Sequence, residues 1–130
     1  MSRFVKAGLI MAALAMTVCA QDWYKQREER YRGERWRSHL FAEVRTDLDH
    51  VWSGHAADRE RERLQKTEEE LAKLQGDLDH GRWDNGILND VIDSIVKSSN
   101  DDRLAPHDRD VLADDVKRLK EFQDQHNRKH

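Results

Sequence analysis

The sequence ILNDVIDSIV at residues 87–96 decides the fold class. Its apolar side chains come as adjacent pairs that recur every four residues, which is the spacing of one wide face of an α-helix. The pairs are Ile87 with Leu88, Val91 with Ile92, and Ile95 with Val96. Such a wide apolar face belongs to a helix that is buried on most sides. The stretch therefore predicts the most buried helix of an all-α protein, beginning after Asp84, Asn85 and Gly86.

Another amphipathic helix is expected on the C-terminal side of this stretch. Residues 98–102 are polar and predict a turn, after which Pro106 suits the first position of a helix. Asp108 and Asp110 suit the positive end of that helix's dipole. Its inward-facing residues would be Val111, Leu112, Val116, Leu119 and Phe122. Residues 123–130 are polar, and we expect them to form a frayed tail.

Two further amphipathic helices are predicted on the N-terminal side. Residues 34–52 carry Trp36, Leu40, Val44, Leu48 and Val51 at helical spacing. Residues 56–80 form a narrower seam of the coiled-coil type, made of Leu64, Leu71, Leu74 and Leu78 with Thr67 at the missing heptad position. Thr67 and Glu70 also match a capping box, which is typical of a helix start. The leucine spacing continues across them and favours one uninterrupted helix.

Short connections between these segments favour antiparallel neighbours. The sequence therefore predicts an all-α, antiparallel helical bundle of four helices over residues 34–122. Two alternatives stay open. One is a pair of helical hairpins that pack less compactly, and the other is a homodimer that completes the leucine seam of residues 56–80.

The first twenty residues have the pattern of a secretory signal peptide. Arg3 and Lys6 precede an apolar run that ends at Val18, and we expect cleavage after Ala20. The run is shorter than the roughly 20 residues that span a bilayer. We therefore expect a secreted or periplasmic protein with no transmembrane segment in the mature chain. The alternative is a lipoprotein anchored through Cys19, the only cysteine, so that the cleaved chain would hold no disulfide.

Residues 21–33 are expected to form a basic, aromatic N-terminal extension. This segment, continued to Ser38, interleaves Trp23, Tyr24, Tyr31 and Trp36 with arginines and a lysine. It is either an arm that docks on an anionic partner or membrane surface, or a solvated helical extension whose aromatic side chains cap the bundle. We favour the second interpretation. The whole chain has a net charge of −3, which is not the balance of a nucleic-acid-binding protein.

Histidine and aspartate supply the candidate metal ligands. The sequence Asp-Leu-Asp-His occurs at residues 47–50 and again at 77–80. Both copies lie near the C-terminal ends of predicted helices, so antiparallel packing would place them at opposite poles, too far apart to share an ion. We interpret the histidines as stabilised by the helix dipole and the aspartates as solvent-exposed. His126 and His130 lie four residues apart in the expected tail, where metal binding would be weak.

Three other patterns carry no assigned chemistry. Ser53, Gly54 and His55 place a hydroxyl beside an imidazole without a third partner, and we interpret them as a helix cap and turn. Residues 98–104 resemble the end of a calcium loop, but Lys97 and Asp102 stand at its first ligand and its glycine. Asn89, Asp90 and Asp93 belong either to a polar network or to an exposed helix edge. No catalytic, cofactor-binding or metal-ligating residue is assigned.

The segment Leu104-Ala105-Pro106-His107-Asp108-Arg109 resembles the leucine, threonine, two variable residues, glutamine motif of the Spy and CpxP family of small periplasmic helical proteins. Leu104 and Arg109 correspond, as do the chain's size, its export signal and its helical content. Ala105 stands where the family has threonine, and Asp108 stands where it has glutamine. The resemblance implies a dimeric envelope-stress chaperone that binds unfolded clients without a nucleotide, and no binding residue is carried over.

These observations together predict an exported, non-enzymatic helical protein that acts through protein contacts in the cell envelope and needs no cofactor. Its protein partner is not identified by the sequence. The alternative is a weak metal-ion-binding periplasmic protein that uses its histidine and aspartate side chains.

Overall fold

A computed structural model describes residues 22–53 and 58–129. These residues divide into two compact units, with the boundary between Trp36 and Arg37. All regular structure in the described ranges is helical. None of the described helices combines the length and hydropathy that crossing a bilayer requires. The expected signal peptide, Cys19 and the expected cleavage after Ala20 lie outside the described residues.

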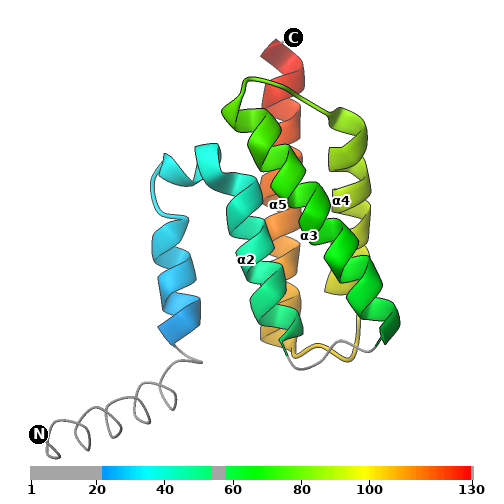
Figure 1. Cartoon of the computed structure of the whole chain (residues 1–130). Helices are drawn as coiled ribbons and strands as arrows, with labels where there is room; N and C mark the ends of the chain where they lie inside the picture. The colour runs from blue at the N-terminus through cyan, green and yellow to red at the C-terminus, as the bar shows by residue number, and fades with distance from the viewer. Residues whose placement is uncertain (1–21, 54–57, 130) are drawn as a thin grey trace, which may run out of the picture. The chain divides into compact units, whose positions relative to one another are not determined.

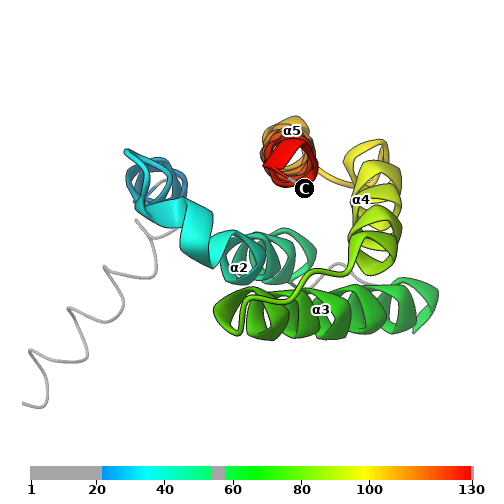
Figure 2. The same ribbon diagram turned by 90° about the horizontal axis from the view of Figure 1, so that it is seen from above.

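The unit that begins at Arg37 is a helical bundle. Its helices are α2 (Leu40–Trp52), α3 (Asp58–Asp79), α4 (Asn85–Ser99) and α5 (Pro106–Lys129), preceded by the 3-10 turn η1 (Arg35–His39). Each helix runs opposite to the one before it, as Figure 1 shows. Each also packs against the next, and α2 packs against α5. The view in Figure 2 shows α2, α3, α4 and α5 arranged around a common interior.

The interior is filled by the predicted apolar faces. The side chains that are almost fully buried include Leu40, Phe41, Val44, Leu48 and Val51 of α2, Leu71 and Leu74 of α3, Leu88, Val91 and Ile95 of α4, and Leu112 and Leu119 of α5. In α3 the fully buried part of the seam is shorter than predicted, because Leu64 and Leu78 at its ends are only half-buried. Thr67 lies in the seam as predicted, and its hydroxyl contacts that of Ser94 on α4 at 2.8 Å. The helix is not interrupted there, because α3 runs from Asp58 to Asp79, and Thr67 Oγ1 donates to the Arg63 carbonyl of the preceding turn.

The start of the first predicted bundle helix differs from expectation. Residues 34–52 do not form one α-helix, because residues 35–39 are a 3-10 turn and α2 begins at Leu40. Gly33 has a φ of 77°, a left-handed conformation that glycine adopts without strain. The Trp36 indole N–H donates to the Gly33 carbonyl at 2.9 Å, which holds the turn tight. The chain therefore reaches α2 through a turn instead of a continuous helix.

The C-terminal residues also differ from expectation. Residues 123–129 are not a frayed tail, because α5 continues through them to Lys129. Gln123 Nε2 donates to the side-chain oxygens of Asn85 at 2.9 Å and Asn89 at 2.8 Å. The His126 ring stacks on Trp83 with 3.7 Å between ring centroids. These contacts with α4 and the segment before it stabilise the last turns of α5.

The unit that ends at Trp36 contains a helical segment over residues 22–30. Its aromatic side chains contact one another and their neighbouring cations. The Trp23 and Tyr24 rings meet edge to face, and the Arg27 guanidinium lies 4.6 Å from the centre of the Tyr31 ring. Arg27 and Arg30, two of the arginines expected in a docking arm, are therefore engaged within this unit.

Candidate functional site

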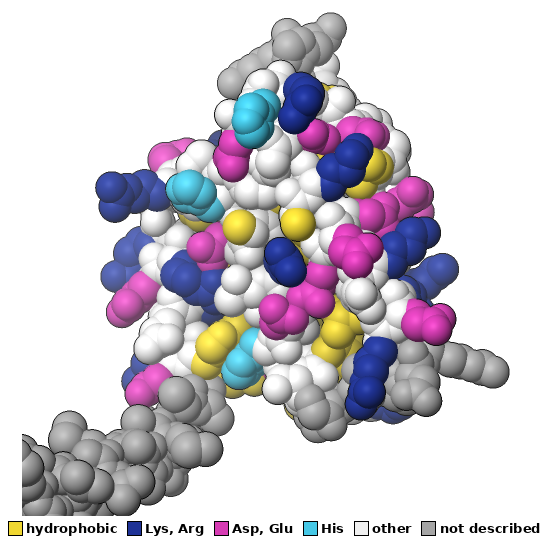
Figure 3. All heavy atoms as spheres, in the orientation of Figure 1, with side chains coloured by type: hydrophobic (Ala, Val, Ile, Leu, Met, Phe, Trp, Pro, Cys, Tyr) yellow, Lys and Arg dark blue, Asp and Glu magenta, His cyan; other side chains and the backbone are white. Residues whose placement is uncertain are grey.

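A groove lies along the outer surface of α2 and α3. It measures about 590 Å³ and is lined by Ala42, Arg45, Thr46 and Asp49 of α2 and by Ala72, Gln75, Gly76 and Asp79 of α3. Three of the lining residues are small, namely Ala42, Ala72 and Gly76, and a Cβ atom added at Gly76 would meet no atom of another part of the structure within 4 Å. Figure 3 shows this face of the bundle, where small hydrophobic side chains lie among Lys, Arg, Asp and Glu side chains.

Gln75 lines the groove and bridges α3 to the start of α2. Its Oε1 accepts the Ala42 backbone N–H at 3.2 Å, and its Nε2 donates to the Ser38 carbonyl at 2.8 Å and to Asp79 at 2.9 Å. Ala42 is the third residue of α2, so its N–H has no partner inside that helix. His39, the N-cap residue, makes no side-chain capping bond. A side chain of α3 therefore supplies a cap that the sequence of α2 does not.

Two carboxyl groups interact between α3 and α2. The side chain of Glu68 of α3 interacts with that of Asp49 of α2. Burial raises the pKa of Glu68 to about 7, and the hydrogen bond and the charge of Asp49 act in the same direction, while the charge of Arg45 opposes them. Glu68 Oε1 is buried and has no hydrogen-bond partner. Glu68 is therefore protonated over a wider pH range than an ordinary glutamate.

An ion-pair network ties together the segments near the start of α3 and α5. Arg103 pairs with Glu60 of α3 and with Asp101, whose Oδ2 lies 2.6 Å from the guanidinium. The hydrogen bonds from Arg103 lower the pKa of Asp101 to about 2. Arg103 also lies 5.9 Å from the centre of the Trp52 ring. The segment that resembles a calcium loop is therefore held by an arginine and its carboxylate partners.

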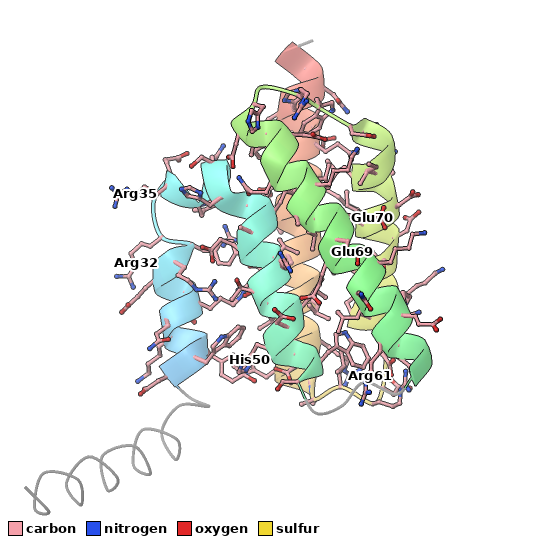
Figure 4. All side chains as sticks on the ribbon, viewed as in Figure 1. Arg32, Arg35, His50, Arg61, Glu69 and Glu70 are labelled. Atoms are coloured by element: carbon pink, nitrogen blue, oxygen red, sulfur yellow. The ribbon has the colours of Figure 1, made fainter. Side chains whose placement is uncertain are left out.

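The two Asp-Leu-Asp-His segments lie at opposite ends of the bundle, as predicted (Figure 1). His50 lies near the C-terminal end of α2, where it is labelled in Figure 4. The expectation that the aspartates are solvent-exposed is wrong for Asp47, which is fully buried. The reason is positional: Asp47 lies three residues after Val44 and four before Val51, within the apolar face. Asp77 is half-buried and lies near Lys73 and Arg82.

The other candidate ligands do not converge either. In the part of the chain that the structure describes, no three His, Cys, Asp or Glu side chains are placed to hold a metal ion. His126 stacks on Trp83, while His130 lies outside the described residues. Asn89 joins a polar network with α5, whereas Asp90 and Asp93 are exposed. Of Ser53, Gly54 and His55, only Ser53 is described, and it follows the last residue of α2.

Comparisons with known proteins identify no relative of this chain. No family model, curated protein or solved structure matches the chain. The groove between α2 and α3 and the hydrogen bonds that Gln75 makes across it are therefore the features that bear on function.

Sequence reasoning did not single out Gln75, Gly76 or the pair of Asp49 and Glu68. Each of them depends on the register between α2 and α3, which the heptad pattern of one helix does not contain. Gly76 carries a partial signal, because a glycine inside a helix lowers its stability by roughly 1 kcal/mol relative to alanine. Its position within α3 could have marked the groove.

Proposed function

We propose that this chain is an exported, non-enzymatic protein that acts through protein contacts in the cell envelope, and that the groove between α2 and α3 is its contact surface. The observation that carries the proposal is the open floor at Gly76, Ala72 and Ala42. Small side chains allow the backbone of a partner segment to approach two helices closely, with polar side chains at the rim to orient it. Floors of this kind suit a helix or an extended peptide better than a small molecule.

The rim supports a protein partner more than catalysis. Thr46 is the only hydroxyl that lines the groove, and its Oγ1 donates to the Ala42 carbonyl of its own helix at 3.1 Å. The rim is weighted toward carboxylates, with Asp49 and Asp79 against Arg45. We propose a chaperone-like activity in which segments of unfolded polypeptide occupy the groove without a nucleotide, as the resemblance to the Spy and CpxP family implies.

One preparation tests both the export of the chain and the contact of its groove with another protein. A photo-crosslinking amino acid placed at Ala72 in the full chain should give protein adducts in the envelope fraction, and the same probe at Ala113, exposed on α5, should give few. Mass spectrometry of the purified chain should find Gln21 at its N-terminus. A chain that keeps Met1, or adducts that are equal at both positions, would contradict the proposal.

The activity is tested with a groove-filling variant. The wild-type chain should suppress the aggregation of reduced α-lactalbumin, and Gly76→Leu should remove most of this effect because its side chain occupies the floor. Since nothing surrounds the Gly76 Cβ position and leucine favours helix, the variant should fold at least as stably as the wild type. Ala113→Leu is the matched control and should act like the wild type. Equal suppression by all three proteins would refute the groove as the contact surface.

A further inference from the structure

Another groove lies between α3 and α4, and charged side chains make up most of its lining. It measures about 310 Å³. Its charged residues are Arg63, Lys66 and Glu70 of α3, the last of which is labelled in Figure 4, and Asp90, Asp93 and Lys97 of α4. Two hydroxyl groups complete the lining, since Thr67 Oγ1 and Ser94 Oγ lie 2.8 Å apart between the helices. The groove therefore offers ionic and hydrogen-bonding contacts.

The charges of this groove are sorted by sign along its length. The contact between Thr67 and Ser94 fixes the level at which the two helices meet, and the helices run in opposite directions (Figure 1). The lining cations of α3 precede Thr67 in the sequence, and its lining carboxylate follows. In α4 the order is reversed, because two carboxylates precede Ser94 and the lysine follows. The groove thus has a basic end, made of Arg63, Lys66 and Lys97, and an acidic end, made of Glu70, Asp90 and Asp93.

Neither end is neutralised by an ion pair. None of the six charged side chains forms a salt bridge with another residue that the structure describes. The acidic end also lacks the convergence that a metal needs, since no three His, Cys, Asp or Glu side chains in the described ranges are placed to hold an ion. Carboxylates that approach from two helices suit an ammonium group instead, because it has three donors that point in different directions.

The distance between the two ends selects the length of a ligand. At 1.5 Å of helix rise per residue, Lys66 and Glu70 lie about 6 Å apart along the groove, and Asp90 and Lys97 lie about 10 Å apart. The ammonium and carboxylate of one α-amino acid are closer than this, since a single carbon joins them. An extended chain advances about 3.3 Å per residue. The termini of a peptide of two or three residues are therefore separated by about 7–10 Å, which matches the groove.

We propose that the groove between α3 and α4 binds short peptides of two or three residues with free termini. The carboxylate of the peptide lies at the basic end and its ammonium at the acidic end. The hydroxyl groups of Thr67 and Ser94 lie between the two ends, where the peptide amides bond to them. A simple anion or cation is attracted by one end and repelled by the other, so the arrangement favours an extended zwitterion.

Trialanine with free termini is the probe, and it is titrated into the full ¹⁵N-labelled chain while the amide resonances of residues 63–70 and 90–97 are followed. Because the ion pairs are exposed to solvent, we expect saturable shifts with a dissociation constant on the order of 1 mM. N-acetyl-trialanine lacks the ammonium and trialanine amide lacks the carboxylate, so each should bind at least roughly fivefold more weakly. Equal binding of the capped peptides, or no saturable shift at about 20 mM trialanine, overturns the proposal.

Two variants test the two ends of the groove. Lys97→Gln and Asp90→Asn each remove one exposed charge and should fold like the wild type. Each should raise the dissociation constant for trialanine roughly three- to fivefold. Lys117→Gln and Asp110→Asn are the matched controls, because they make the same changes at exposed positions of α5 and should bind like the wild type. Equal losses in all four variants would assign the effect to overall charge and overturn the site.

The inference goes beyond the proposed function and does not depend on it, since the two grooves share no lining residue. Gly76→Leu, which fills the groove between α2 and α3, should bind trialanine like the wild type. If it weakens binding as much as Lys97→Gln does, the peptide occupies the other groove and this inference fails. Loss of the chaperone activity without loss of trialanine binding, or the reverse, separates the two proposals.

Discussion

At the scale of single residues, two side chains of α3 connect it to α2 in different ways. Gln75 satisfies a backbone N–H that α2 leaves without a partner. Glu68 instead has a pKa raised to about 7, first by burial and then by its interaction with Asp49 of α2. The first contact is insensitive to pH and the second depends on it. The two positions therefore predict different behaviour when they are substituted.

Gln75→Ala should lower the free energy of unfolding by about 1 kcal/mol, because it removes the cap of α2 and leaves the Ala42 N–H to water. Urea denaturation followed by circular dichroism measures the change. Gln65→Ala is the matched control, since Gln65 lies on the same helix and bonds only to the exposed Glu69. An equal loss in both variants would show that the capping contact adds nothing.

Glu68→Gln should change how stability depends on pH. The folded-state pKa of Glu68 lies above its ordinary value of 4.5, so the unfolded chain loses this proton first and wild-type stability falls as pH rises from there to about 7. The fall should be about 1 kcal/mol, because solvent screens this half-buried group. Glu68→Gln should lack this component and be the more stable protein at about pH 8.5. Unfolding curves across this range that run parallel in both proteins would refute the assignment.

The position of a single residue could be predicted only where it depends on the spacing within one helix. Thr67 was correctly placed in the α3 seam because a heptad position depends on spacing alone. Asp47 is buried, against expectation, because its position on the apolar face of α2 outweighs the preference of its charge for solvent. Gln75 and Glu68 act across two helices, and their partners could not be identified without the register between those helices.

At the scale of elements, the extent of α5 shows how tertiary contacts override local composition. Residues 123–129 contain no large aliphatic side chain, so composition alone favours a frayed end. Trp83 reverses this outcome, because its ring lies against both Phe122 and His126. The boundary of α5 is therefore determined by a residue that precedes α4.

Trp83→Ala should release the last turns of α5. We expect faster amide hydrogen exchange across residues 123–129 and a loss of about 1–2 kcal/mol in the free energy of unfolding, since two ring contacts disappear. Lys120→Ala, an exposed change on the same helix, should leave the exchange rates unaltered. Unchanged protection in Trp83→Ala would mean that the glutamine and asparagine contacts are sufficient.

At the scale of the whole molecule, the all-α bundle could be predicted because its helices bury continuous apolar faces. The spacing of residues 87–96 and 106–122 is visible without any knowledge of their neighbours. The 3-10 turn at residues 35–39 was not visible in the same way, because Trp36 fits the apolar spacing of a helix while its indole bonds to Gly33. The groove could not be predicted from the sequence, because its shape depends on how α2 and α3 pack against each other.

The common interior makes the bundle sensitive to cavities in any of its helices. Leu112 is fully buried in α5, and Leu112→Ala should lower the free energy of unfolding by about 3 kcal/mol. Lys117→Ala on the exposed side of the same helix should cost less than about 0.5 kcal/mol. Thermal or urea unfolding measures both. A small effect at Leu112 would mean that α5 does not share the core of the other described helices.

The hydrogen bond from Arg37 Nη1 to Gln125 Oε1, 2.8 Å long, joins the beginning of the bundle to the last turns of its final helix. The beginning of the bundle and the last turns of α5 therefore lie close together. A circular permutant could link the end of α5 to the start of α2 and open the connection between α4 and α5 instead. If the permutant forms the same core, the order of the helices along the chain is not required for the packing of their buried side chains.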